Sequence, residues 1–227
     1  MAQPWRVEFH CHTFYSKDSG VQVEALIRQA RRKKIDRLVI TDHNTIGGAL
    51  AAHGLAPELV IVGEEILTTR GELLAAFVRE EVPAGLPPRE AIARLREQGA
   101  FISVSHPFDL QRHGWQLPDL LEIAPLVDAV EIFNARCLLE QTNRAAQHFA
   151  AERGLPGTAG SDAHGLVEVG RAVLRLPPFA SADDLRAVIG QGEVEGRLSP
   201  PAVHMISVFA RLGKRLGWIK QPPARKA

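Results

Sequence analysis

The first residues that could do chemistry are two histidines one position apart, His10 and His12, in the stretch FHCHTFYSKDSG at 9–20. They follow a short apolar run typical of a β-strand, and alternate side chains of a strand point to the same face. Two imidazoles on one face can bind a single metal ion. This stretch alone is equally compatible with two surface histidines, so the decision depends on the rest of the chain.

Short apolar runs alternate with amphipathic stretches along the chain. The strand-like runs fall at 5–9, 37–41, 59–67, 72–78, 100–105, 128–133 and 155–160. Helical spacing appears at 23–34, 88–99 and 138–154. Arg70-Gly71 marks a hairpin-like turn before 72–78. This alternation predicts one α/β domain built on a parallel sheet.

Polar residues gather where these predicted strands end, which is where parallel sheets carry their chemistry. Each of them has an ordinary explanation when taken singly, because a Gly-Ser-Asp is usually a turn and a lone His is usually solvated. Six such coincidences at the same end of one sheet favour a functional cluster. The residues concerned are His10, His12, Asp42, His43, Glu64, Glu65, His106, Asn134, Asp162 and His164.

The residue types in this cluster indicate a metal centre. Histidines mixed with carboxylates, without a close pair of thiolates, favour Zn, Mn or Fe. The side chains are too many for one ion, so we expect two or three divalent ions that share a bridging carboxylate. Clustered ions suit in-line displacement at phosphorus, because they activate water and neutralise the attacking and leaving oxygens.

Taken in order, the motifs FHCHTFYSKDSG, ITDHNT, VGEEIL, SHPFD, EIFNAR and GSDAH resemble those of the PHP (polymerase and histidinol phosphatase) superfamily. The resemblance runs from residue 6 to about residue 172. It implies a distorted parallel (β/α)7-type barrel with about seven strands. It also implies a two- or three-metal cluster that hydrolyses phosphoesters.

The resemblance also implies a role for each residue of the cluster. The implied ligands of the first ion are His10, His12, Glu65 and Asp162. Glu65, rather than Glu64, would bridge to a second ion held by His106 and Asn134. The implied ligands of the third ion are Asp18, His43 and His164. Asp42 is expected to orient an imidazole from outside the ligand set.

The chain departs from some relatives in its ligand positions. Asp18 and Asn134 stand where those relatives have His, and Asn is a weak neutral ligand that favours a harder ion such as Mn²⁺. Many relatives also carry a His in the strand after the bridging Glu. At that position GELLAAF offers only Leu and Ala, which cannot bind a metal ion.

Three residues are predicted to carry the reaction itself, namely Glu65, Asp162 and Arg136. Arg136 is two residues past Asn134, so it would share the face of that side chain if the strand continued. Its guanidinium could then hold a substrate phosphate by a bidentate contact. Other cations in loops at the same end are Lys17, Arg112, His113 and Arg171.

The bulk composition limits the class of partner. The chain has 227 residues and a net charge of +1, which argues against a general polyanion binder. Two cysteines provide no disulfide framework, and the chain lacks a signal peptide or a long apolar run. We therefore expect a soluble cytoplasmic protein with no membrane partner and no stable nucleic-acid partner.

The predicted organisation is a PHP metallophosphoesterase domain over 1–200, followed by a C-terminal helix and basic tail over 201–227. Residues 210–227 carry six basic residues and no acidic one. A basic amphipathic end can touch nucleic acid or membrane, but a solvated terminus is the expectation.

The predicted function is hydrolysis of a small phosphate ester, a nucleotide or an amino-alcohol phosphate, by attack of metal-bound hydroxide on phosphorus. Two alternatives stay open at this point. One is a 3′–5′ exonuclease on short oligonucleotides, and the other is a non-catalytic metal-stabilised binding module. The nearly complete ligand set argues against the binding module, because a structural site needs only about four closed ligands.

Overall fold

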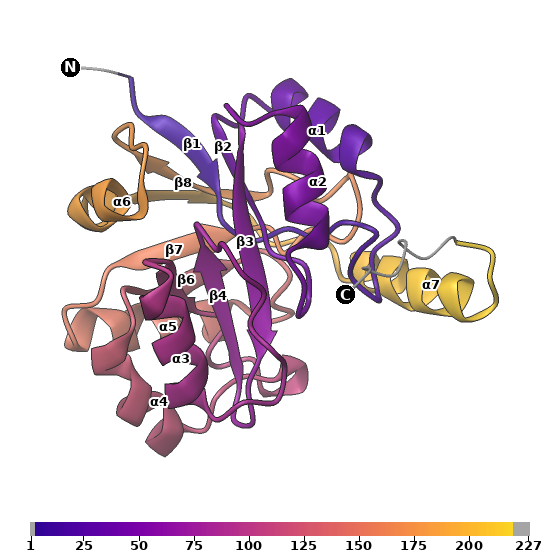
Figure 1. Ribbon diagram of the computed structural model, residues 1–227. Coiled ribbons are helices and arrows are strands. Elements are labelled where there is room, and N and C mark those ends of the chain that lie inside the picture. The colour runs from indigo at the N-terminus through magenta and orange to yellow at the C-terminus, as the bar shows by residue number, and fades with distance from the viewer. Residues whose placement is uncertain (1–2, 220–227) are drawn as a thin grey trace.

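A computed structural model describes residues 3–219 of the chain (Figure 1). The strands are β1 (Trp5–Glu8), β2 (Arg37–Ile40), β3 (Val60–Leu67), β4 (Glu72–Ala76), β5 (Phe101–Val104), β6 (Ala129–Asn134), β7 (Gly157–Gly160), β8 (Ala172–Leu176) and β9 (Glu193–Gly196). The α-helices are α1 (Val23–Arg32), α2 (Gly47–Leu55), α3 (Pro88–Glu97), α4 (Leu117–Ile123), α5 (Glu140–Glu152), α6 (Ala182–Val188) and α7 (His204–Arg215).

The first seven strands form a nearly closed ring. The sheet order is β7-β6-β5-β4-β3-β2-β1-β8-β9. Beyond the end of β1, the His12 N–H donates to the Ala163 carbonyl oxygen at 2.9 Å, and the Asp162 N–H donates to the His10 carbonyl oxygen at 2.8 Å. This extension of β1 pairs with the extension of β7, which closes the ring. The predicted single-domain α/β barrel is therefore confirmed, and β8 and β9 are added outside it.

The sheet is not parallel throughout, because β4 runs antiparallel to both β3 and β5. The reversal is a tight turn, in which the Thr68 N–H donates to the Gly71 carbonyl oxygen at 2.9 Å. A Cβ at Gly71 would lie 2.5 Å from the Trp115 ring, so only Gly fits there. As a result, β4 begins at the end of the barrel where β3 finishes.

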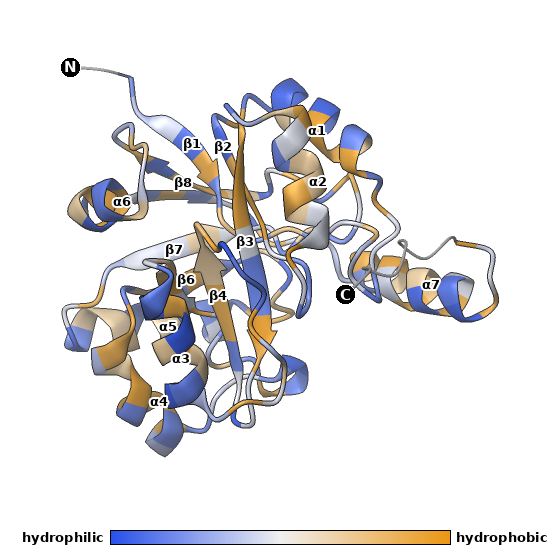
Figure 2. Ribbon diagram, viewed as in Figure 1, coloured by the Kyte–Doolittle hydropathy of each residue, from blue (hydrophilic) through white to orange (hydrophobic). Residues whose placement is uncertain are grey.

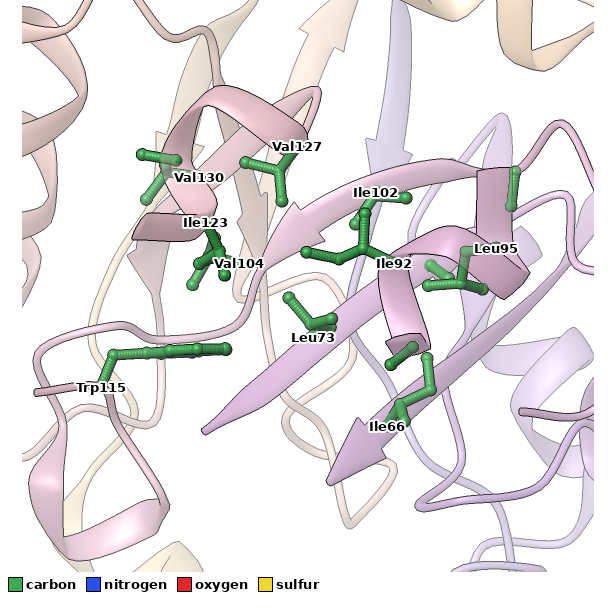
Figure 3. Close-up of a cluster of buried hydrophobic side chains, with 14 of the residues drawn as sticks. Ile66, Leu73, Ile92, Leu95, Ile102, Val104, Trp115, Ile123, Val127 and Val130 are labelled. Atoms are coloured by element: carbon green, nitrogen blue, oxygen red, sulfur yellow. The ribbon is translucent and has the colours of Figure 1, made fainter. Parts of the chain in front are cut away.

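Apolar side chains fix this hairpin in the barrel. Figure 3 shows Ile66 and Leu73, from the hairpin, packed with Ile92 and Leu95 of α3. In Figure 2 blue and orange residues alternate along the helices, and parts of the strands, including the upper part of β3, are orange. Burial of each such side chain stabilises the fold by about 1.5–3 kcal/mol. This packing holds the strand ends that carry the polar cluster.

The C-terminal segment departs from the expected solvated terminus. Residues 204–215 form α7, whose buried face includes Ser207, Ala210 and Lys214. The Lys214 ammonium donates to the Phe14 carbonyl oxygen at 2.6 Å and to the Ser16 carbonyl oxygen. This part of the predicted tail is therefore packed on the loop after β1, because those carbonyls need a donor. Residues 220–227 lie outside the described residues.

Across residues 3–219, we find no helix with both the length and the apolar character needed to cross a bilayer.

Candidate metal centre

Glu65 lies at the centre of the cluster that the strand ends bring together. Its Oε2 atom is 3.3 Å from His10 Nε2 and 3.5 Å from His12 Nε2. The same oxygen is 3.0 Å from His43 Nδ1, and Oε1 is 3.3 Å from His106 Nε2. Four imidazoles from the segments that follow β1, β2 and β5 thus surround one carboxylate that is 1% exposed.

Two further carboxylates extend the cluster on either side. Asp162 Oδ1 is 3.2 Å from His12 Nε2 and 3.6 Å from His10 Nε2. Asp18 Oδ1 is 3.3 Å from His164 Nε2 and 3.5 Å from His43 Nε2. In each of three residue sets, the possible ligand atoms all lie within 4.8 Å of one another. The sets are His12, His43 and His164; His10, His12 and Asp162; and His43, Glu65 and Glu72.

Several atoms that face this cluster are buried without a hydrogen-bond partner, namely His10 Nε2, His12 Nε2, Asp18 Oδ1 and Glu65 Oε2. Native proteins seldom leave buried polar atoms unsatisfied, since each costs free energy. Burial and the neighbouring imidazoles of His164 and His43 lower the pKa of His12 to about 3, which keeps its lone pair available. Imidazole nitrogens and carboxylate oxygens that converge in this way fit divalent transition-metal ions.

Asp42 orients His12 through a serine hydroxyl. The Ser16 hydroxyl donates to Asp42 Oδ1 at 2.6 Å, so its oxygen can accept the Nδ1–H of His12 at 3.1 Å. The Thr13 hydroxyl donates to the other Asp42 oxygen at 2.6 Å. Because Nδ1 of His12 carries the proton, Nε2 presents a lone pair to the cluster. Asp42 therefore has the kind of orienting contact that the sequence suggested.

Glu131 does the same for His10, and the sequence analysis did not name it. Its Oε1 atom is 2.9 Å from His10 Nδ1, and its Oε2 atom accepts the His106 N–H at 2.8 Å. The side chain is buried. The available signal was a single acid in the apolar strand AVEIF, because a buried Glu needs a partner to offset its desolvation.

Glu72 is a second residue that the sequence analysis missed. Its Oε2 atom lies 3.5 Å from His106 Nε2. Burial and the charge of Glu65 raise the pKa of Glu72 to about 8. The segment GELLAAF contains no histidine, but its glutamate, Glu72, begins β4 at the site. The signal was the hairpin itself, because a returning strand starts where the first strand ends.

Asn134 reaches the cluster, but its amide has other partners. Its Nδ2 donates to Asp162 Oδ2 at 3.2 Å and to Glu131 Oε2 at 3.1 Å. Its Oδ1 accepts the backbone N–H of Arg136 at 2.9 Å and lies 3.3 Å from Arg112 Nη2. The amide nitrogen of Asn134 thus holds two carboxylates by hydrogen bonds, and its amide oxygen accepts from N–H donors.

Arg136 lines the pocket that opens onto the cluster, but its guanidinium nitrogens are held by groups of the protein itself. Its Nε atom is 2.9 Å from Glu168 Oε1, and its Nη2 donates to Ser207 Oγ at 3.0 Å and to the Val203 carbonyl oxygen at 3.1 Å. Its Nη1 is 2.7 Å from His164 Nδ1. The strand ends at Asn134, so the alternation of the pleat no longer sets the direction of Arg136. The guanidinium thus links the end of β6 to α7, and its expected contact with a substrate phosphate stays a prediction.

We expect Arg136→Met to lower the free energy of unfolding by about 3–5 kcal/mol, because it leaves the buried Glu168 carboxylate without its ion pair. Urea denaturation of the metal-free chain measures this. Arg144→Met is the matched control, since Arg144 forms an exposed pair with Glu140 at 3.1 Å, and such pairs contribute little. If Arg136→Met lowers the free energy of unfolding no more than Arg144→Met does, the buried ion pair between Arg136 and Glu168 does not stabilise the fold as proposed.

Arg112 is a second arginine that contacts the cluster. It ends the 3-10 turn Leu110–Arg112 that follows β5. Its Nη1 forms an ion pair with Asp162 Oδ2, and its Nε donates to Asp109 Oδ2 at 2.8 Å. Although burial favours the neutral acid, His10 and Arg112 hold the pKa of Asp162 well below its usual range.

A pocket of about 260 Å³ opens onto the cluster. Among the cations named from the sequence, Lys17, Arg112, His113 and Arg136 line it, whereas Arg171 does not. Arg211 of α7 lines it as well. The lining of the pocket is therefore rich in positive charge, which suits an anionic substrate.

Comparison with known proteins places the chain in a family. The PHP domain model matches residues 8–85, and the PHP-associated model matches residues 140–194. An uncharacterized protein of Methanocaldococcus jannaschii is 36% identical over 175 residues, which cover 75% of this chain and 70% of that protein. The chain belongs to the PHP family. The resemblance seen in the sequence motifs is thereby confirmed.

Solved structures show that this PHP chain shares its fold with distant proteins. PsfC of Pseudomonas syringae PB-5123 superposes with a TM-score of 0.69 at 18% identity, covering 94% of this chain and 100% of PsfC. A Bifidobacterium adolescentis protein named as a candidate metal-dependent phosphoesterase gives a TM-score of 0.59 at 19% identity, covering 73% and 89% of the two chains.

Proposed function

We propose that this PHP protein is a metal-dependent hydrolase that acts on small phosphate esters. The observation that carries the proposal is the set of unpartnered buried nitrogen and oxygen atoms around Glu65, at the floor of a pocket with a cationic wall. Membership of the PHP family and the fold shared with the candidate phosphoesterase support it. The substrate is a nucleotide or an amino-alcohol phosphate.

Two or three divalent ions, Mn, Zn or Fe, would be held by nine side chains in three groups. For the first ion these are His10, His12, Glu65 and Asp162. For the second they are Glu65, His106 and Glu72, with Glu72 in place of the expected Asn134. For the third they are Asp18, His43 and His164. When bound, such ions activate a water molecule and neutralise the charge of phosphate oxygens.

The chain's own residues orient the substrate and keep the ligands in place. Arg112 can pair with phosphate oxygens through its planar guanidinium, which also contacts Asp162 in the structure. Asn134 and Arg112 both donate to Asp162, so this carboxylate stays ionised with its Oδ1 directed at His12. Glu131 and Ser16 fix the tautomers of His10 and His12.

The size of the pocket favours a compact substrate. A volume of about 260 Å³ is below the usual range of drug-sized ligand sites, and it suits a phosphate with a small organic group. We therefore expect no stable nucleic-acid partner for this pocket.

We expect purified protein to contain two to three transition-metal ions per chain and to release phosphate from small esters. Elemental analysis measures the first, and a panel of nucleotides, amino-alcohol phosphates and short oligonucleotides measures the second. A chelator should abolish turnover. One ion or fewer per chain after Mn²⁺ and Zn²⁺ supplementation would contradict the cluster. Turnover of oligonucleotides alone would favour the exonuclease alternative.

A further inference from the structure

The outward face of α7 carries a stripe of exposed apolar side chains. Its members, spaced three or four residues apart along the helix and continued just beyond it, are 44–77% exposed: Met205, Val208, Phe209, Leu212, Leu216 and Trp218. Figure 1 shows α7 projecting from the side of the barrel. A contiguous exposed apolar stripe of this kind marks an interaction surface.

The opposite face of α7 is tied to the body, so the stripe cannot turn inward. Lys214 donates to the carbonyl oxygens of Phe14 and Ser16. Ser207 accepts a hydrogen bond from Arg136 at 3.0 Å. The helix is thus held by polar contacts on one side, and its apolar stripe is presented to the surroundings on the other.

The charge around the stripe indicates the chemistry of its partner. Residues 196–227 contain seven Lys or Arg and no Asp or Glu, whereas residues 1–195 contain 20 basic and 26 acidic residues. Arg211 and Arg215, on the same helix, are exposed. A second copy laid symmetrically on this face would bring like charges together, which is unfavourable.

The rest of the chain is a poor occupant for this surface. The eight residues that follow Ile219, KQPPARKA, contain only Pro and Ala as apolar residues and add three positive charges. A partner must therefore supply both negative charge and an apolar layer.

We propose that α7 docks the protein on the surface of an anionic phospholipid bilayer. The apolar stripe enters the boundary between headgroups and acyl chains, and the exposed side chains of Arg211 and Arg215 contact the headgroup phosphates. Trp218 has the amphipathic ring that favours this boundary. The absence of a spanning segment led the sequence analysis to expect no membrane partner, but surface docking needs no such segment. This inference is independent of the proposed hydrolase activity.

The test is co-sedimentation of the full chain with vesicles. We expect it to bind mixed phosphatidylcholine–phosphatidylglycerol vesicles and not pure phosphatidylcholine vesicles, and to be released by high salt. Phe209→Asp should weaken vesicle binding roughly tenfold or more, because it removes a large apolar contact and adds a negative charge. Leu139→Asp is the matched control, since both side chains are 63% exposed and Leu139 lies before α5.

Three results would overturn the proposal: equal binding to the two kinds of vesicle, binding unaffected by Phe209→Asp, or no binding at all. Light scattering after size-exclusion chromatography measures the oligomeric state, which tests whether a second copy of the chain covers the stripe instead. A dimer that Phe209→Asp dissociates, together with no vesicle binding, would assign the stripe to contact between copies of this chain.

Discussion

Glu65→Gln is expected to reduce both the metal content and the phosphatase activity of the protein, the activity by roughly a hundredfold or more. The side chain contacts the imidazoles of His10, His12, His43 and His106, and it is the only residue to touch all four among residues 3–219. Gln keeps its shape but lacks the charge that holds cations together. Even substitution of a residue that only hydrogen-bonds to a metal ligand lowers metal affinity or activity roughly ten- to a hundredfold.

Glu64→Gln is the matched control for that experiment. Glu64 accepts the Val82 N–H at 3.0 Å on the other face of β3, away from the imidazoles. We expect it to retain metal and most of the activity. Elemental analysis and phosphate release, measured on both variants, give the comparison. If Glu64→Gln loses metal while Glu65→Gln keeps it, the bridging assignment is wrong.

Arg112→Met is expected to lower kcat/KM by roughly ten- to a hundredfold, because a charge-assisted hydrogen bond to phosphate contributes about 1.5–3 kcal/mol. The metal content should stay unchanged, since a guanidinium stays protonated and cannot ligate a cation. Arg112→Lys should restore only part of the loss, because an ammonium cannot reproduce the planar fork.

Arg171→Met serves as the control for Arg112, since Arg171 does not line the pocket. Steady-state kinetics on the best ester of the panel, with metal analysis of the same samples, provide the measurement. Wild-type efficiency in Arg112→Met would move the phosphate contact to Lys17 or His113. Loss of metal along with activity would instead show that Arg112 acts by positioning Asp162.

Some features of the site were predictable because they depend on local geometry. The alternation of side chains along a strand placed His10 and His12 on one face, whereas the choice of Glu65 over Glu64 came from the resemblance to the PHP motifs. The gathering of strand ends at one edge of the sheet brought His106 and Asp162 into the cluster. These rules need only neighbouring residues and a regular strand.

Contacts between distant segments decided the rest. Glu72 enters the site because β4 reverses direction and is packed antiparallel between β3 and β5. Glu131 orients a ligand only because the fold brings it beside His10, which is 121 positions away in the sequence. No pattern within either segment reports these partners.

The arginines show the limit most clearly. Arg136 was assigned by extending a strand that in fact ends at Asn134, and its direction is set by Glu168 and by Ser207, which lies 71 positions away on α7. Arg112 follows a strand end in an irregular turn, where no periodicity applies. By itself the sequence determined the α/β alternation and placed the central histidines and carboxylates at strand ends, because strand periodicity is local, while the barrel was implied by the resemblance to the PHP superfamily. Only the tertiary structure decided that Arg112 pairs with Asp162 and that Arg136 joins Glu168 and α7, because a buried charge goes where distant partners can satisfy it.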